Sequence, residues 1–155
     1  MELVVPEVVA TQAQGLHDQA LDLNLAVGSR VEVLRRLGAL ASRVHAEIDA
    51  DEAAAALLAR ERLGSTVVQA GLALPHARLP TIEAPVLCAV RLAQGVDFDG
   101  DMVSLAVGVF VPENRPEMHL DVLRKIAIVL REPQRVVALH QAETKERFLT
   151  LMKGG

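Results

Sequence analysis

Two long apolar runs in the second half of the chain constrain its fold more than any other feature. Residues 86–92 (VLCAVRL) are nearly all apolar, and residues 103–111 (VSLAVGVFV) form a longer run that ends at Pro112. Near-continuous apolar runs of this length are typical of strands that are covered on both faces. The acidic, glycine-containing segment 94–101 (QGVDFDGD) is predicted to be the hairpin connection between them. We therefore expect a central sheet with helices packed on both of its faces.

Strand and helix patterns follow one another in the N-terminal half. Residues 21–25 alternate between leucine and polar side chains, which predicts a half-buried strand. Two capping-box spacings come next, Ser29 with Glu32 and Asp49 with Glu52. Each precedes a segment whose composition or apolar periodicity favours a helix. Two successive helices are therefore expected before the first histidine-containing segment discussed below.

The C-terminal part of the chain is predicted to be helical. Pro116 stands where the first turn of a helix would begin, and residues 134–141 and 143–152 are predicted to form two short closing helices. The whole order predicts an α/β fold with a mixed sheet of about five strands. A length of 155 residues is typical of one domain, residues 1–155, in which residues 1–14 are expected to be a loose N-terminal segment.

Composition argues against several classes of protein. No apolar stretch approaches the roughly 18 residues that a membrane-spanning helix needs, and the N-terminus lacks the basic start of a signal peptide. The single cysteine, Cys88, is predicted to be a small buried hydrophobe in a reducing, cytoplasmic setting. A net charge of −4 with no Trp or Tyr offers little for nucleic-acid binding. Neither a metal-ligand spacing nor a nucleotide-binding loop is present, so no metal or cofactor is predicted.

Residues 64–80 (GSTVVQAGLALPHARLP) place one histidine in a constrained setting. Two short strands are predicted at 67–68 and 72–74, with a turn between them. Pro75 fixes its own φ and biases the preceding residue toward an extended conformation, so the backbone that enters His76 is stiff. His76 is therefore predicted to lie at a strand end, on a loop held by a rigid scaffold, where reactive groups tend to be found.

Several guanidinium groups are close to His76 in the sequence. Arg78 follows it, and Arg60 and Arg62 precede it on a predicted helix. Neighbouring positive charge disfavours the imidazolium form, whereas planar guanidinium groups match phosphate oxygens. This arrangement favours a phosphate-handling histidine over a surface or satisfied core histidine. On a regular helix Arg60 and Arg62 are about 200° apart, so only one of them can face the phosphate, and the pattern alone does not choose between them.

The same residues carry a family resemblance. Residues 57–79 (LLARERLGSTVVQAGLALPHARL) resemble the active-site signature of type-2 IIA proteins, the fructose, mannitol and nitrogen-regulatory class of the bacterial phosphotransferase system. The matching pairs are Arg60-Glu61, Ser65-Thr66 and Pro75-His76. The distance in sequence from the arginine to the histidine, 76 − 60 = 16 residues, is the one expected for the family and selects Arg60 over Arg62.

A second family histidine begins an H-L-x-x-L helix, which His119-Leu120 and Leu123 match. The resemblance therefore spans about residues 15–152. Ala77 departs from the glycine that is usual in the family after the reactive histidine. A methyl group there could restrict the approach of a partner or alter the loop, but it removes no reacting atom.

The resemblance implies a site and a reaction. His76 would accept a phosphoryl group from the phosphohistidine of a small carrier protein similar to HPr. Arg60 would stabilise the charge on the transferring group, and His119 would contribute a hydrogen bond, unless His119 is simply a satisfied core histidine. The hydroxyls of Ser65 and Thr66 and the guanidinium of Arg78 would assist in binding phosphate.

The resemblance leaves the downstream role open. A freestanding nitrogen-regulatory protein would act on a regulatory target protein, whereas the soluble arm of a sugar permease would donate phosphate to a IIB domain. The absence of any fused permease segment in the sequence modestly favours the first. Two further alternatives are an interaction module that transfers nothing and a hydrolase that releases the phosphoryl group to water.

Overall fold

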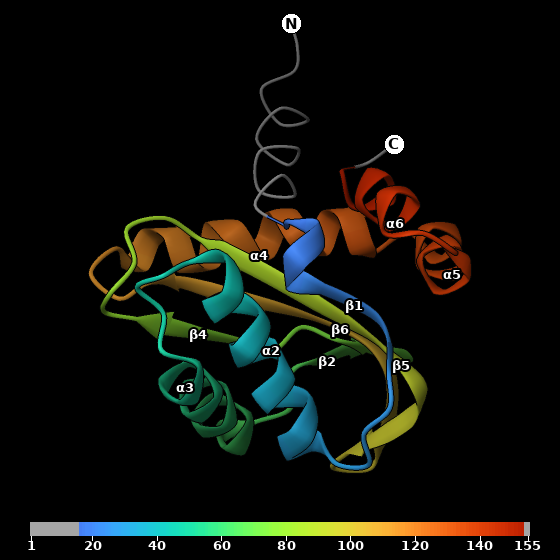
Figure 1. Cartoon of the computed structure of the whole chain (residues 1–155), viewed down its shortest axis with the longest axis horizontal. Coiled ribbons are helices and arrows are strands. Elements are labelled where there is room, and N and C mark those ends of the chain that lie inside the picture. Colours follow the sequence, from blue (N-terminus) through green and yellow to red (C-terminus); the bar gives the residue numbers. More distant parts are fainter. Residues whose placement is uncertain (1–15, 154–155) are drawn as a thin grey trace, which may run out of the picture.

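A six-stranded mixed sheet forms the centre of the structure, a computed structural model that describes residues 16–153 (Figure 1). The predicted loose segment, residues 1–14, lies outside the described residues. The strands are β1 (Leu21–Leu25), β2 (Val67–Gln69), β3 (Gly71–Ala73), β4 (His76–Leu79), β5 (Val86–Phe98) and β6 (Asp101–Pro112). Their order is β1-β5-β6-β3-β2, and β4 also pairs with β6. The predicted α/β fold with a mixed sheet is confirmed, with six strands where about five were expected.

The two apolar runs form the antiparallel hairpin β5–β6 at the middle of the sheet. The hairpin is longer than predicted, because both strands continue through most of segment 94–101 as far as a two-residue turn. Asp99 and Gly100 form that turn with φ values of 57° and 105°. Positive φ at both central positions suits the twist of a tight hairpin. The acidic composition of this segment therefore marks an exposed hairpin end rather than a long connection.

Within residues 16–153, five α-helices and a short 3-10 helix accompany the sheet. They are η1 (Asp18–Ala20), α2 (Arg30–Val44), α3 (Ala50–Leu63), α4 (Pro116–Leu130), α5 (Pro133–Gln141) and α6 (Lys145–Met152). Both predicted caps are confirmed: Glu32 N–H donates to the Ser29 hydroxyl and Glu52 N–H donates to the Asp49 carboxylate, at 3.2 and 2.9 Å. Each cap satisfies one of the backbone donors that a helix start leaves without a partner.

The helices cover both faces of the sheet. In Figure 1, α2 and α3 lie in front of the strands and α4 lies behind them. At the crossing of α2 and α3, Gly38 allows a close approach, because a Cβ on it would lie 2.6 Å from the Ala50 carbonyl oxygen. The two helices therefore pack at a short distance, and α3 contacts β4 at the edge of the sheet.

The sheet edge that carries His76 is built from two strands in line. Antiparallel β2 and β3 form a small hairpin, and β3 and then β4 pair parallel with successive parts of β6. His76 pairs with Val109 and Leu79 with Pro112, so the prediction that His76 lies on a loop is wrong. Only Leu74 and Pro75 separate the two strands. A four-residue strand after a proline has no detectable periodicity, and its partner lies more than thirty residues later in the chain.

The core is mostly aliphatic, and Phe98, Phe110 and Phe148 are fully buried within it. Cys88 is fully buried in β5, which confirms it as a small buried hydrophobe. Burial raises the pKa of its thiol far above the ordinary range, so the thiolate does not form near neutral pH. Among the helices of residues 16–153, none combines the length and apolar character needed to cross a bilayer.

Candidate functional site

His76 is the first residue of β4 and lies beside the C-terminal end of α3. The residue lines two neighbouring cavities. The residue is 9% exposed, so its ring is largely enclosed but still reaches both cavities. Pro75 leads into it, and the Pro75 carbonyl accepts a hydrogen bond from Val109 N–H of β6 at 2.9 Å. The backbone that leads into His76, predicted to be stiff because of the proline, is thus also hydrogen-bonded to the central strand β6.

Hydrogen bonds to both ring nitrogens define the tautomer of His76. Nδ1 lies 2.9 Å from the Leu74 carbonyl oxygen, and Nε2 lies 3.2 Å from Nε of Arg60. A carbonyl oxygen can only accept, so Nδ1 carries the proton, and a guanidinium N–H can only donate, so Nε2 presents its lone pair. The nitrogen that faces Arg60 is therefore the nucleophilic one.

Arg60 is held between the helix end and the histidine. It belongs to the last turn of α3, and its second contact is a hydrogen bond of 2.8 Å from Nη1 to the Gly64 carbonyl oxygen. The guanidinium thus helps to satisfy the C-terminal end of its own helix while its Nε–H points at Nε2 of His76. Both contacts hold its positive charge beside Nε2 of His76.

The surroundings of His76 keep its imidazole neutral. Burial lowers the pKa of His76 below its ordinary value of 6.5, and the Arg60 guanidinium lowers it further. The hydrogen bond to Leu74 and the Glu61 carboxylate act in the opposite direction without reversing the shift. A neutral ring with a lone pair on Nε2 is the form that nucleophilic catalysis requires.

His119 lies in the first turn of α4, and its ring approaches that of His76 edge-on. The ring centroids are 5.3 Å apart, and the two planes meet at 61°. Burial lowers the pKa of His119, and the neighbouring His76, Arg78 and Arg60 lower it further. Within residues 16–153 its buried Nδ1 has no hydrogen-bond partner. His119 is therefore close to the His76 ring, and one of its ring nitrogens makes no hydrogen bond among the described residues.

The first cavity, which we call the polar cleft, lies on the side of His119. Its volume is about 710 Å³. Its lining residues are Ala56, Ala59, Arg60, Leu63, His76, Ala77, Arg78, Glu113 and His119. Two guanidinium groups and two imidazoles thus face one space together with a single carboxylate. Such a set of N–H groups suits a multiply charged anion such as a phosphoryl group.

The second cavity, which we call the apolar cleft, lies between the β2–β3 hairpin and α4. It is lined by Arg60, Ser65, Thr66, Val67, Val68, Leu74, His76, Leu120, Leu123, Arg124 and Ala127. Ser65 is exposed, and its Oγ accepts Val67 N–H at 3.1 Å, which leaves the hydroxyl proton outside this bond. The apolar walls and the exposed Leu120, at 61%, form a surface suited to another protein rather than to a small polar molecule.

Glu61 is a residue near the site to which the sequence pattern assigns no role. Its side chain is 3% exposed, and its two carboxylate oxygens accept Thr66 Oγ1–H at 2.6 Å and Thr66 N–H at 3.1 Å. The Thr66 hydroxyl therefore donates its proton to Glu61 and has no second proton to donate to another group. The available signal was the spacing of five residues between Glu61 and Thr66 across a helix end. In a helix so rich in charged residues, nothing in the pattern separates one buried carboxylate from the solvated ones.

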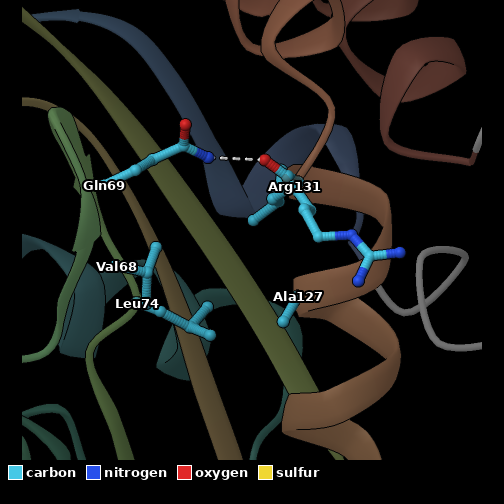
Figure 2. Close-up of a pocket in the computed structure, with 6 residues that line it drawn as sticks. Val68, Gln69, Leu74, Ala127 and Arg131 are labelled. Atoms are coloured by element: carbon cyan, nitrogen blue, oxygen red, sulfur yellow. Dashed lines mark hydrogen bonds between the residues drawn. The ribbon is translucent and has the colours of Figure 1, made fainter.

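A further apolar hollow continues the apolar cleft away from His76 (Figure 2). The two cavities share Val68, Leu74 and Ala127. At the far end the Gln69 side-chain amide donates a hydrogen bond of 2.7 Å to the Leu130 carbonyl (Figure 2). This bond ties the β2–β3 hairpin to the C-terminal end of α4, and so fixes the distance between the two walls of the cleft.

Most of the residues predicted for the site converge, and one arginine does not. Arg60, Arg78 and His119 share the polar cleft with His76, whereas Ser65 and Thr66 line the apolar cleft. Arg62 is exposed and lines neither cleft, in keeping with its expected rotation away from Arg60. In the part of the chain that the structure describes, no group of three or more His, Cys, Asp or Glu side chains is arranged to hold a metal ion.

The chain matches a family model over nearly its whole length. The model described as "Phosphoenolpyruvate-dependent sugar phosphotransferase system, EIIA 2" covers residues 15–154. This range includes every element of the described fold and all residues of both clefts.

Individual relatives agree with this match. A nitrogen regulatory protein of Pseudomonas aeruginosa is 38% identical over 133 residues, which are 84% of this chain and 86% of that protein. The mannitol-specific phosphotransferase enzyme IIA component of Staphylococcus aureus is 33% identical over 130 residues, 81% and 86% of the two chains. The crystal structure of nitrogen regulatory protein IIA-Ntr from Neisseria meningitidis superposes with a TM-score of 0.83 at 29% identity, covering 90% of this chain and 97% of that one.

Proposed function

The chain belongs to the EIIA 2 family of the phosphoenolpyruvate-dependent sugar phosphotransferase system, and from this premise we propose that it carries a phosphoryl group on His76. The observation that carries the proposal is the state of the His76 ring. Its Nδ1–H is bound by the Leu74 carbonyl, and its Nε2 lone pair faces a guanidinium at the floor of an open cleft. A neutral, oriented imidazole is a competent nucleophile without further activation.

In the proposed reaction the Nε2 lone pair attacks the phosphorus of a phosphohistidine on a donor protein. The N–P bond to His76 forms while the N–P bond of the donor breaks, and the donor nitrogen keeps the electron pair of its broken bond. The proton on Nδ1 stays in its hydrogen bond to Leu74, and the donor ring, protonated on its other nitrogen, leaves as a neutral imidazole, so no proton passes between the two rings. The reaction then depends on positioning and on stabilisation of charge on the equatorial oxygens.

Arg60 has two consecutive tasks in this proposal. Before transfer its Nε–H donates to Nε2 at 3.2 Å, and its charge adds to the effect of burial in lowering the pKa of His76 and keeping the ring neutral. When the phosphoryl group arrives, the guanidinium leaves the nitrogen and donates to phosphoryl oxygens instead. Arg78 and His119 add N–H donors from the polar cleft, and Ser65 adds a hydroxyl from the other side. Thr66 contributes through its backbone and its bond to Glu61 rather than through its hydroxyl proton.

The donor in this proposal is a small phosphocarrier protein similar to HPr, as the family resemblance implies. The apolar walls of the apolar cleft and the exposed Leu120 support contact with a protein there. The acceptor is a regulatory target protein in the preferred version, for which the 38% identity to a nitrogen regulatory protein is the support. The 33% identity to a mannitol-specific IIA component supports a IIB domain as the alternative acceptor.

One mixing experiment tests the function. The purified chain is added to an excess of phosphorylated carrier protein, and its intact mass and the inorganic phosphate in solution are followed over time. Stable addition of one phosphoryl group is the expected result. Failure to gain mass would contradict the carrier function and favour an interaction module, and a gain followed by rapid release of phosphate would favour a hydrolase. Offering the phosphorylated chain to a mannitol-type IIB domain then separates the two acceptors, since efficient transfer would favour the sugar route.

A further inference from the structure

A continuous line of hydrogen bonds runs from the end of α3 to the reactive ring. Glu61 accepts the N–H and the Oγ1–H of Thr66, at 3.1 and 2.6 Å. The Thr66 carbonyl accepts Leu74 N–H at 2.9 Å, and the Leu74 carbonyl accepts His76 Nδ1–H at 2.9 Å. Each group in the line is therefore oriented by the one before it, starting from a single carboxylate.

The line is enclosed over its whole length. Glu61 is 3% exposed, Thr66 4% and Leu74 5%. Hydrogen bonds in such surroundings are stronger than in water, and a buried donor or acceptor without its partner is strongly disfavoured. The Leu74 carbonyl therefore has little freedom to turn away from the ring while Thr66 stays in place.

We propose that Glu61 is a positioning residue that sets the tautomer of His76 through Thr66 and Leu74. Arg60 and Glu61 are neighbours in the sequence, and they reach the ring from opposite sides: Arg60 directly at Nε2, and Glu61 through the backbone at Nδ1. The last turn of α3 thereby influences the hydrogen bonds at both ring nitrogens of His76. The inference rests on the proposed function for its consequence, because a fixed tautomer matters when a group is to be received at Nε2.

The proposal is tested by nuclear magnetic resonance on the unphosphorylated protein, in which long-range ¹H–¹⁵N spectra distinguish protonated from unprotonated ring nitrogens. In the wild-type chain the proton of the neutral ring is expected on Nδ1. Glu61→Ala removes both bonds to Thr66. Because Arg60 by itself still favours a lone pair on Nε2, the change is measured in an Arg60→Ala background, where we expect the ratio of tautomers to move by roughly fivefold or more toward Nε2–H. No movement in a folded protein that carries both substitutions would overturn the proposal.

Two matched variants separate the hydrogen-bonded line from the charge and from general effects on α3. Glu61→Gln keeps the shape of the side chain, because its amide oxygen can accept Thr66 N–H while its amide NH₂ donates to Thr66 Oγ1. This variant is expected to retain the wild-type tautomer. A shift as large as that of Glu61→Ala would instead assign the effect to the carboxylate charge. Glu52→Gln, at an exposed position of the same helix, should change nothing, and an equal shift there would also contradict the proposal.

Thr66→Val serves if Glu61→Ala does not fold. It removes the hydrogen bond from Thr66 Oγ1 to Glu61 and keeps the one from Thr66 N–H. A smaller shift of the tautomer ratio in the same direction is therefore expected, and no shift would overturn the proposal.

Transfer kinetics give a second readout. Because Glu61 is buried and cannot touch the donor, Glu61→Ala or Thr66→Val should lower kcat while KM for the donor changes less than about twofold. If wild-type His76 accepts no phosphoryl group but its tautomer responds as described, the proposed function fails and the positioning role stands.

Discussion

His76 and His119 have ring centroids 5.3 Å apart, yet the molecule constrains the two rings in different ways. His76 is held at both nitrogens, by the Leu74 carbonyl and by Arg60. His119 comes from the other side of the sheet edge, at the start of α4, and among the described residues its Nδ1 has no partner. Burial contributes most to the lowered pKa of each, so both are neutral near pH 7.

The difference teaches which ring suits which task. A nucleophile needs one protonation state and one orientation before the reaction begins, and the contacts of His76 supply both. A hydrogen-bond donor to a group that arrives and leaves needs a nitrogen that is not already committed, and His119 retains one. Under the proposed function the two rings therefore divide into an acceptor of the phosphoryl group, His76, and an auxiliary that responds to it, His119.

Replacing His76 with alanine has the largest expected effect, since it removes the nucleophile. His76→Ala should accept no phosphoryl group from phosphorylated carrier, as measured by intact mass, while its circular dichroism stays that of the wild type. The matched control is His17→Ala, an exposed histidine outside both clefts. Undiminished labelling of His76→Ala would mean that another residue accepts the phosphoryl group. It would contradict the assignment of His76 as the acceptor and His119 as the auxiliary.

Removing the guanidinium at Nε2 is expected to have the next largest effect. Arg60→Ala should slow phosphoryl uptake by about 3 kcal/mol, or roughly a hundredfold or more, as for the loss of one charge-stabilising donor. The pKa of His76 should also rise toward 6.5, because the guanidinium is one cause of its depression. Single-turnover rates and a resonance titration of His76 measure the two effects.

Arg62→Ala is the control for this prediction. Arg62 has the same chemistry two residues along α3 but lines neither cleft, so its loss should leave the transfer rate within about twofold. A wild-type rate in Arg60→Ala, together with a slow Arg62→Ala or Arg78→Ala, would move the role to another guanidinium.

His119→Ala should slow transfer by roughly tenfold, the effect of losing one hydrogen bond to a charged group. Its melting temperature should change little, because the ring is only half-buried and its Nδ1 makes no bond in the unphosphorylated fold. Comparing the single-turnover rate with the melting curve of His119→Ala distinguishes a role in transfer from a structural role in the core. A large drop in melting temperature with an unchanged rate would make His119 a core histidine and remove it from the site.

The lowered pKa of His76 predicts how uptake responds to acid. An imidazole that titrates at about 6.5 is only roughly one quarter neutral at pH 6. Because the pKa of His76 is lower, more than that fraction keeps its Nε2 lone pair at pH 6, and loss of the neutral form begins only at more acidic pH. A resonance titration of the His76 ring checks this, and a midpoint at or above 6.5 would contradict it. The same titration should place His119 below 6.5 as well.

Ala77→Gly is expected to have the smallest effect. Within the described chain, Asp99 is the single non-glycine residue with positive φ, so Ala77 sits in ordinary strand conformation and glycine is not required there. Transfer should change by less than about twofold, and the free energy of unfolding should fall by about 0.5–1 kcal/mol, because glycine weakens a strand. Urea unfolding and single-turnover rates test both parts. A marked gain in transfer rate would show that the alanine methyl group obstructs the donor.

The sequence by itself determined the elements whose signals are local. The caps at Ser29 and Asp49, the apolar runs of β5 and β6 and the stiff approach through Pro75 each depend on a few consecutive residues. The family pattern added Arg60 and His76 as a pair, and the structure brings these two into hydrogen-bond contact. The roles assigned to them remain predictions of the proposed function.

The tertiary structure decided how those elements meet. That His76 starts a strand depends on pairing with β6. Leu74, Thr66 and Glu61 are joined into one line toward its ring by the β2–β3 hairpin and by the contact between Thr66 and the end of α3. The burial of Glu61 depends on α3 packing against the sheet edge, which no helix pattern reveals. Propensities and caps act over a few residues, whereas the tautomer of the His76 ring depends on the Leu74 carbonyl and on Arg60, which the packing of α3 against β4 brings within hydrogen-bond distance.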